Sequence, residues 1–206
     1  MNPPIARLLA PPDADRAGHV LAQAFLDDPL NVSFYADPAQ RAARTPPMYH
    51  FLARFGIEAG IAWGVGEPLA SVALWSGPSS PRMGLLRILR AGGLRLAFSP
   101  LIWRVPRAAR IFGEAGRMQE HYAPEPHLYL QVLGTLPEAQ GSGFGAALVR
   151  AMIAEADRAN LPIYTETMTP RNVAWYEHFG FRVMEHYRPP TSDLNLWGFK
   201  RPATAT

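Results

Sequence analysis

A glycine-rich segment in the C-terminal half of the chain has the composition of an anion-binding loop. It reads Gln140-Gly141-Ser142-Gly143-Phe144-Gly145-Ala146. An apolar run typical of a strand, residues 128–133, precedes it, and apolar residues at helical spacing follow it. Glycines let the backbone turn with its N–H groups inward, and the N-terminus of the following helix adds partial positive charge. The segment therefore predicts a phosphate site built from backbone N–H groups.

Two other kinds of nucleotide-binding loop fit this segment less well. A P-loop would continue with Gly-Lys-Ser/Thr, and the sequence supplies neither that lysine nor that hydroxyl. The dinucleotide fingerprint is closer, because Gly141, Gly143 and Ala146 match its loose form and Glu166 follows at about its 20-residue spacing. However, residues 136–140 separate the strand from the first glycine, and Pro137 has no N–H for a central strand. A dinucleotide-dependent oxidoreductase therefore remains a less favoured alternative.

The loop resembles the acetyl-coenzyme A loop of the GNAT N-acetyltransferase superfamily, whose pattern is Arg/Gln-x-x-Gly-x-Gly/Ala. Gln140, Gly143 and Gly145 occupy its three defined positions. Further along, residues 170–181 resemble the Tyr-x-x-x-Gly-Phe segment of the same superfamily. More narrowly, residues 130–145, 165–167 and 170–172, with Trp63 and Trp75 upstream, are similar to the puromycin N-acetyltransferase branch. No resemblance is recognised from Ser79 to Pro126.

This resemblance implies a donor site for acetyl-coenzyme A. The backbone N–H groups from Gly141 to Ala146 would hold the pyrophosphate. The end of the preceding strand, Leu133-Gly134-Thr135, would separate from its neighbour and offer N–H groups to the acetyl carbonyl and the pantetheine arm. Gly134 fits a plain bulge or a close-packing glycine equally well. Asn172 would contact the coenzyme, although it lies nearer to Tyr176 than in many members, and a helix N-cap is an equal alternative.

The resemblance also implies two catalytic residues. Tyr176 corresponds to the tyrosine that acts as general acid toward the departing sulfur, and an ordinary core tyrosine is its alternative. Glu166 corresponds to a glutamate that some protein N-terminal acetyltransferases use as a base. Strand alternation places Tyr164 and Glu166 on one face, where burial would raise the pKa of the carboxyl group. A purely structural hydrogen-bonding role for Glu166 is the alternative.

The acceptor pocket is expected on the side of the helical N-terminal half and of the early hairpin. Its candidate residues are Phe25, Asp28, Tyr35, Trp63 and Trp75. The aromatic residues could equally be core, and Asp28 could belong to a solvated helix end. The six histidines show no metal-ligand spacing, so no metal is expected.

Composition favours a single domain over residues 1–206, with 48% hydrophobic residues and no cysteine, and the resemblance implies that it is a GNAT domain. The net charge of +3 includes a single lysine, Lys200, which disfavours nucleic acid as a partner. No signal-peptide core follows Met1, so a cytoplasmic location is expected. The stretch from Gly84 to Val105 contains too many arginines to span a membrane. It is predicted to form two helices that pack their apolar side chains inward, with a membrane-surface segment as the alternative. These side chains are Leu85, Leu86, Ile88, Leu89, Leu94, Leu96 and Phe98.

Periodicity predicts a mixed α/β fold, and the resemblance implies a central mixed, twisted sheet of about six to seven strands flanked by helices. Helices are expected over residues 14–25, 41–59 and 145–159, within 81–119, and briefly before Gly180. Strands are expected over 60–66, 69–75, 128–134, 163–167, 181–187 and 194–199. The first two strands would form a hairpin, and so would the last two, while the strands around the glycine loop would be parallel.

Together these observations predict an acetyl-coenzyme A-dependent N-acetyltransferase that acts directly on a primary amine of a small molecule. Protein N-termini and polyamines would suit the same catalytic half as acceptors. A coenzyme A-binding regulatory module without catalysis is an alternative, but it would not need Tyr176 or Glu166. The chain is expected to be a monomer or a homodimer.

Overall fold

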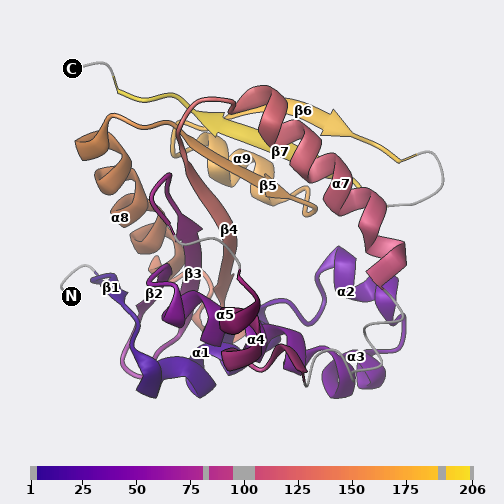
Figure 1. The fold of residues 1–206 in the computed structure, drawn as a ribbon. Coiled ribbons are helices and arrows are strands. Elements are labelled where there is room, and N and C mark those ends of the chain that lie inside the picture. Colours follow the sequence, from indigo (N-terminus) through magenta and orange to yellow (C-terminus); the bar gives the residue numbers. More distant parts are fainter. Residues whose placement is uncertain (1–3, 81–83, 95–104, 190–193, 205–206) are drawn as a thin grey trace.

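The computed structural model describes residues 4–80, 84–94, 105–189 and 194–204, and within these ranges seven strands form one twisted sheet (Figure 1). The strands are β1 (Arg7–Leu8), β2 (Ala62–Val65), β3 (Ser71–Ser76), β4 (Leu128–Thr135), β5 (Ile163–Thr167), β6 (Arg182–Tyr187) and β7 (Leu196–Arg201). Their spatial order is β1-β2-β3-β4-β5-β7-β6. The pair β4–β5 is parallel and the other neighbours are antiparallel. The predicted mixed sheet, its two hairpins and its parallel pair are confirmed.

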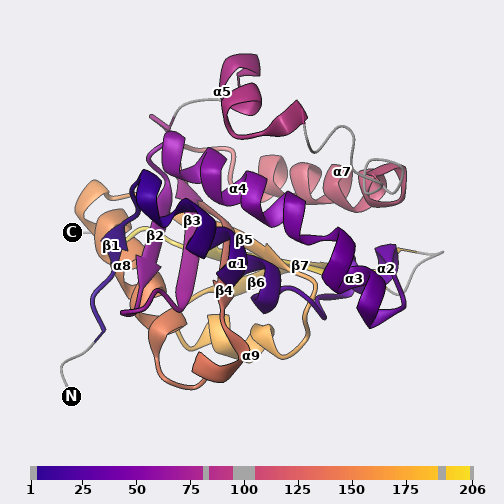
Figure 2. The ribbon, with the colours of Figure 1, turned by 90° about the horizontal axis from the view of Figure 1, so that it is seen from below.

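Helices cover both faces of this sheet (Figure 2). They are α1 (Ala14–Ala24), α2 (Pro29–Phe34), α3 (Pro38–Arg44), α4 (Pro46–Glu58), α5 (Leu85–Arg90), α7 (Val105–Tyr122), α8 (Phe144–Ala159) and α9 (Asn172–Glu177), with short 3₁₀ turns η1 (Pro11–Asp13) and η3 (Pro137–Ala139). The apolar stripe of α8 runs through Leu148, Val149, Met152 and Ala156, all buried. Asn160 ends α8 in the left-handed conformation at φ 50°, as its type predicts.

The two faces of the sheet carry separate hydrophobic clusters. On one face, α1 and α4 pack over β3 and β4, and Val20, Leu21 and Leu74 are buried there. On the opposite face, α8 and α9 bury Leu148, Met152 and Tyr176 against Leu130 and other strand residues. On the first face, α7 covers β5 and β7, and Met118 and Tyr164 are buried beneath it. The loop after β4 leads into α8, whereas α1, α2 and α4 lie across the sheet from it.

The helix predicted over residues 41–59 is wrong as a single element, because the structure divides it at Thr45. Pro46 and Pro47 take the first positions of α4, where a missing N–H costs nothing, and α3 stops at Arg44. The helix α2 was not predicted. The sequence nevertheless contains a signal for its start, because Asp28 is a preferred N-cap residue. Its carboxylate accepts a hydrogen bond from the N–H of Leu30 at 3.0 Å. The two-residue strand β1 has no sequence signal of its own.

The prediction that the leucines of the 84–105 stretch pack inward is wrong for three of them. The exposed fractions are 60% for Leu86, 48% for Leu89 and 60% for Leu94. The side chain of Leu85 and the predicted core residues Leu96 and Phe98 lie outside the described residues. Within the described ranges, no helix combines the length and the apolar character needed to cross a bilayer.

Candidate active site

The glycine loop forms an open cradle at the N-terminus of α8. Gly141 and Gly143 adopt φ values of 82° and 81°, which a side chain disfavours, and Gly143 is the N-cap of α8. A Cβ atom added to either glycine would meet no atom within 4 Å. The side chain of Phe144 instead turns inward and packs against the clusters on both faces. The loop therefore leaves free space on its outer side.

The backbone N–H groups from Gly143 to Ala146 line this cradle and have no acceptor in the described parts of the chain, whereas the N–H of Ser142 donates to the carbonyl of Ala139 at 3.4 Å. The first hydrogen bond of α8 runs from the N–H of Ala147 to the carbonyl of Gly143 at 2.9 Å, so the N–H groups from Gly143 to Ala146 precede the helical ladder. The helix continues for 16 residues and adds its dipole to these donors. Several unpaired donors beside open space fit a pyrophosphate, which is the group that coenzyme A would bring.

Replacing Gly143 with valine should raise the dissociation constant of coenzyme A at least tenfold. The valine strains a left-handed residue by about 1–2 kcal/mol and places a side chain where the cradle is open. Isothermal titration calorimetry would measure the effect. Gly60→Val is a matched control, because Gly60 also has a positive φ of 69° and open space at its Cβ but lies at the end of α4. Equal affinities of the two variants for coenzyme A would show that this loop does not bind the pyrophosphate.

Strands β4 and β5 part before they end. Their pairing covers Leu128–Leu130 against Ile163–Thr165, although β4 continues to Thr135. At the same point the pairing of β3 with β4 shifts: Trp75 lies opposite Leu130 and Leu74 opposite Val132, so Gln131 is an extra residue. Such a bulge bends a strand and frequently lies beside an active site. Beyond Leu130, the edge of β4 that faces away from β3 has no strand partner among the described residues.

The residues Leu133, Gly134 and Thr135 lie on this separated part of β4. Gly134 is a close-packing position rather than the bulge, since a Cβ there would lie within 3.1 Å of Leu21, Ala24 and Phe25. The hydroxyl of Thr135 shares a 2.8 Å hydrogen bond with Ser71 and lies close to Gly145. Gln140 donates from its side chain to the carbonyl of Thr135 at 3.4 Å. The strand end and the glycine loop are thus tied together.

Tyr176 lies at the point where the strands part. Its ring is 5% exposed and packs against Phe181 and Phe199 on the α8 face. Burial raises the pKa of its phenol to about 12, while a hydrogen bond to Thr165 opposes this rise. Thr165 belongs to the last pair of β4 with β5. The phenol is therefore protonated at neutral pH and can donate a proton beside the separated strands.

Asn172 does not cap α9, so that alternative is wrong. The N-cap is Arg171, and the side-chain nitrogen of Asn172 donates to the hydroxyl of Thr167 at 3.0 Å. This bond ties the start of α9 to the end of β5. Trp175, one turn further along α9, lies beside Gly145 of the glycine loop. A Cβ atom added to Gly145 would be 3.8 Å from the indole. Asn172 thus begins the helix whose Trp175 packs beside the glycine loop.

Glu166 lies on the opposite face of β5 from Tyr176. Its carboxylate accepts a hydrogen bond from the hydroxyl of Tyr129 on β4 at 2.9 Å. Burial raises the pKa of Glu166 to about 7, and the hydroxyls of Tyr129 and Tyr164 lower it only partly. The second carboxylate oxygen, Oε1, and the hydroxyl of Tyr164 are both buried without a hydrogen bond of standard geometry in the described residues. A buried carboxylate with a pKa near neutrality has the properties of a general base.

Asp28, Phe25 and Tyr35 lie on the same face of the sheet as Glu166. Burial raises the pKa of Asp28 to about 6, although its N-cap bond to Leu30 opposes this. Phe25 stacks on Tyr49 with ring centroids 5.4 Å apart. It also packs against Gly134, where an added Cβ atom would lie 3.0 Å from the Phe25 ring. Tyr35 is buried in the cluster beneath α7 that also contains Tyr164. These three predicted residues thus lie on the same side of the sheet as Glu166.

The structure does not bring Trp63 and Trp75 to this face. The two indoles stack on each other at 4.8 Å and pack in the cluster beneath α8. The indole nitrogen of Trp75 donates to Glu155 of α8 at 3.0 Å. Both side chains therefore lie on the α8 side of the sheet, across from Glu166 and Asp28.

Two residues that organise this site were not predicted. Tyr129 holds Glu166, and only the register of β4 against β5 reveals it, because Tyr129 lies opposite Tyr164. Arg41 is 5% exposed and donates hydrogen bonds to the carbonyls of Leu26, Tyr35 and Ala36, and it forms an ion pair with Asp27. This arginine fixes the turns around α2. The sequence does not indicate that Arg41 is buried, because an arginine in an amphipathic helix is ordinarily solvated.

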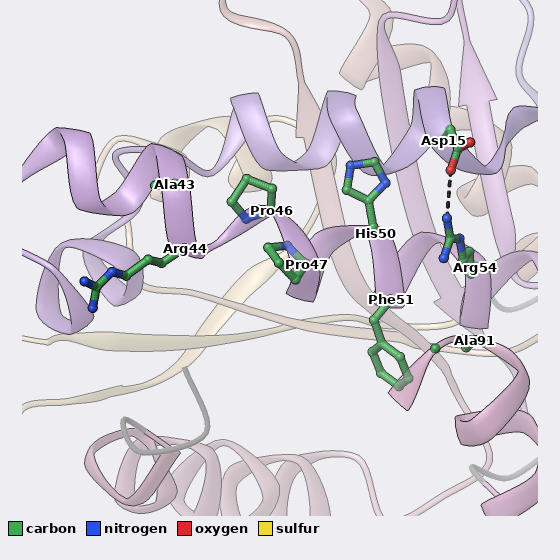
Figure 3. Close-up of a pocket in the computed structure, with 10 residues that line it drawn as sticks. Asp15, Ala43, Arg44, Pro46, Pro47, His50, Phe51, Arg54 and Ala91 are labelled. Atoms are coloured by element: carbon green, nitrogen blue, oxygen red, sulfur yellow. Dashed lines mark hydrogen bonds and ion pairs between the residues drawn. The ribbon is translucent and has the colours of Figure 1, made fainter. Parts of the chain in front are cut away.

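The described residues contain no cluster of three or more His, Asp or Glu side chains with the geometry of a metal site. A hollow of about 680 Å³ lies elsewhere, along α4 on the side of α5 (Figure 3). It is lined in part by Arg44, His50 and Arg54, and Arg54 is ion-paired with Asp15 at 2.9 Å. This hollow is separate from the residues around Glu166.

Comparison with known proteins finds acetyltransferases similar to this chain. Residues 102–183 match the family model described as "Acetyltransferase (GNAT) domain". That range contains the glycine loop, Glu166 and Tyr176 but not α1, α2 or Asp28. An uncharacterized N-acetyltransferase of Schizosaccharomyces pombe is 28% identical over 180 residues, which are 82% of this chain and 70% of the relative.

Solved acetyltransferase structures share the fold. A Corynebacterium glutamicum structure described as histone acetyltransferase HPA2 and related acetyltransferase aligns with a TM-score of 0.66 at 20% identity, over 99% of this chain and 98% of that one. The polyamine N-acetyltransferase of Drosophila melanogaster aligns with a TM-score of 0.64 at 12% identity, over 96% and 98% of the two chains. At these identities the likeness concerns the architecture alone.

Proposed function

Because the chain carries a GNAT acetyltransferase domain and is an acetyl-coenzyme A-dependent acyltransferase, we propose that it transfers the acetyl group directly to the primary amine of a small molecule. The observation that carries this proposal is the arrangement around the last β4–β5 pair. Tyr176 lies on one side of that pair with the glycine loop, and Glu166 lies on the other with Asp28 and Phe25. Donor and acceptor would meet where the two strands separate.

In this proposal the chain supplies the groups that acetyl transfer requires. The N–H groups of the glycine loop hold the pyrophosphate, and those of Leu133 to Thr135 orient the acetyl carbonyl and the pantetheine arm. Acetyl-coenzyme A supplies the activated acyl group. Glu166 accepts the proton that the amine must lose to attack, while Tyr176 donates one to the sulfur as the carbon–sulfur bond breaks. Asn172 orients the region between Thr167 and the loop.

Asp28 supports an amine that carries positive charge beyond the reacting nitrogen. Its half-buried carboxylate faces the acceptor side, and its ionisation near pH 6 leaves it negative at neutral pH. A polyamine satisfies this requirement, because it keeps a second protonated amine while one amine reacts. A protein N-terminus is the second candidate, because the same catalytic residues would serve it.

Replacing Asp28 with asparagine should raise KM for a cationic amine about tenfold and leave kcat within twofold. Asparagine caps α2 as well as aspartate does, so the change removes the charge and keeps the fold. Steady-state kinetics with spermidine would measure it. Asp37→Asn is the matched control, because Asp37 caps α3 through the N–H of Ala39 at the same 3.0 Å. An equal effect of both substitutions would show that Asp28 acts through general electrostatics or structure.

Two measurements test the proposal as a whole. Thermal unfolding with acetyl-coenzyme A, coenzyme A, NAD or buffer reports the donor, because a ligand at 100 times its dissociation constant adds about 2.7 kcal/mol of stability. Thiol release with puromycin, spermidine, tyramine and an alanine-initiated peptide then reports the acceptor. Turnover of the amines but not of the peptide supports a small-molecule acceptor. Stabilisation by coenzyme A without turnover of any amine would favour a regulatory module, and stabilisation by NAD alone would favour the oxidoreductase alternative.

A further inference from the structure

The helix α5 turns large apolar side chains toward solvent. Leu86 and Leu89 are three residues apart and thus share a side of the helix, and Leu94 follows after Gly92-Gly93. All three are about half exposed or more. Single exposed leucines are normal on a protein surface, but three within nine residues form an unusual group. We refer to Leu86, Leu89 and Leu94 as the α5 leucines.

The contact of α5 with the rest of the protein uses a small residue instead. Ala91 is 1% exposed and packs in a cluster with Phe55, Ala59 and Ile61 of the α4 region. Arg87 donates to the carbonyl of Glu58 at 3.3 Å. Figure 2 shows α5 on the outer side of α4, away from the sheet. Ala91, directly after α5, therefore anchors the helix at its C-terminal end, while Leu86 and Leu89 remain exposed.

The surroundings of the α5 leucines are strongly basic. Arg87 and Arg90 alternate with them, and between Glu67 and Glu114 the sequence contains seven arginines and no acidic residue. The hollow beside the C-terminal end of α5 adds Arg44, whereas its Arg54 is paired with Asp15 and burial lowers the pKa of His50 (Figure 3). Exposed leucines interleaved with arginines suit a surface that is negatively charged outside and apolar beneath.

We propose that α5 and Leu94 form a membrane-contacting surface that binds bilayers rich in anionic phospholipid. The α5 leucines enter the acyl boundary, while Arg87 and Arg90 contact lipid phosphates. Arg44 lines the hollow beside them and extends the positive surface. This activity is independent of acetyl transfer, because the glycine loop, Glu166 and Tyr176 lie on other elements.

The charges favour a bilayer over a second copy of the chain as the occupant. A two-fold contact through the α5 leucines would place Arg87 and Arg90 of one copy near the same residues of the other. Such like-charge contacts are unfavourable, because residues 68–113 contain no acidic residue and Glu58, next to Arg87, sets one carboxylate against two arginines in each copy. Anionic lipid headgroups supply the missing negative charge.

Vesicle co-sedimentation of the full chain tests this proposal. The protein should bind vesicles of phosphatidylcholine containing about a third phosphatidylserine and should not bind pure phosphatidylcholine vesicles. Arg87→Gln/Arg90→Gln should weaken binding roughly 25-fold, since each arginine near an anionic surface contributes about fivefold. Leu86→Gln/Leu89→Gln should weaken it at least tenfold. Both variants should retain the wild-type rate of acetyl transfer in solution.

The charge-matched control is Arg150→Gln/Arg158→Gln, which removes two exposed arginines from α8 and should bind vesicles as the wild type does. Thermal unfolding of each variant confirms that it is folded. Failure of the wild type to bind anionic vesicles would overturn the proposal, as would equal loss of binding in the α8 control. A concentration-dependent dimer in sedimentation velocity that Leu86→Gln/Leu89→Gln converts to monomer, without vesicle binding, would assign the face to a second copy.

Discussion

Replacing Glu166 with glutamine should lower kcat/KM by about 10²- to 10³-fold at pH 8, the range expected when a general base is lost. The wild-type rate should rise with pH and level off above about pH 7, where the carboxyl group ionises. The variant should lose this rise, because no group with that pKa remains to titrate. Rate profiles between pH 5.5 and 9 at saturating acetyl-coenzyme A would measure both effects.

The same substitution should stabilise the folded protein at high pH. The pKa of Glu166 is about 7 when folded and 4.5 in its ordinary state, so the folded state holds the proton more tightly between these values. The free energy of unfolding therefore falls as pH rises from about 4.5 to 7, by about 3 kcal/mol in total. Urea unfolding should show Glu166→Gln more stable than the wild type at pH 8 and nearly equal to it at pH 4.5.

A matched control separates catalysis from structure. Glu155 also accepts a hydrogen bond from an aromatic side chain, Trp75, at 3.0 Å, but it lies on α8. Glu155→Gln should leave the pH–rate profile unchanged. A Glu166→Gln enzyme that kept the wild-type rate while gaining stability would make Glu166 a structural partner of Tyr129 and would remove it from the proposed mechanism.

Replacing Tyr176 with phenylalanine should lower kcat by about 10²-fold or more and leave the affinity for coenzyme A within twofold. The ring remains to pack against Phe181 and Phe199, so the loss concerns the proton donor beside the separated strands. Because the pKa of this phenol is raised to about 12, the wild-type rate should show no fall from its ionisation up to pH 10. Single-turnover rates and calorimetric titration with coenzyme A would measure these quantities.

The cost of the lost hydrogen bond to Thr165 must be separated from the loss of catalysis. One neutral hydrogen bond contributes about 1 kcal/mol to stability, so the variant should remain folded. Tyr122→Phe is a suitable control, because Tyr122 lies on α7 and also interacts with a neighbouring side chain, Glu185. Unchanged turnover in Tyr176→Phe would reassign this tyrosine to the hydrophobic core.

Local patterns determined much of this protein. The strand from Ile163 to Thr167, the helix after the glycine loop and the end of that helix at Asn160 follow from hydrophobic period and capping residues within a few positions. The glycine loop was predictable for the same reason, since its left-handed residues and the helix that follows are contiguous in the chain. The break between α3 and α4 at Thr45 also has a local cause, because Pro46 and Pro47 follow it directly in the sequence.

The tertiary structure decided the features that depend on distant residues. The bulge at Gln131, the separation of β4 from β5 after Leu130, and the hydrogen bond from Tyr129 to Glu166 arise from strand register, which is set by pairing across more than 30 positions of sequence. Register and packing also decided that Trp63 and Trp75 face α8 and that the α5 leucines face solvent. Hydrophobic periodicity predicts which face of a helix or strand a residue occupies. Only the packing of the elements determines whether that face contacts another element or solvent.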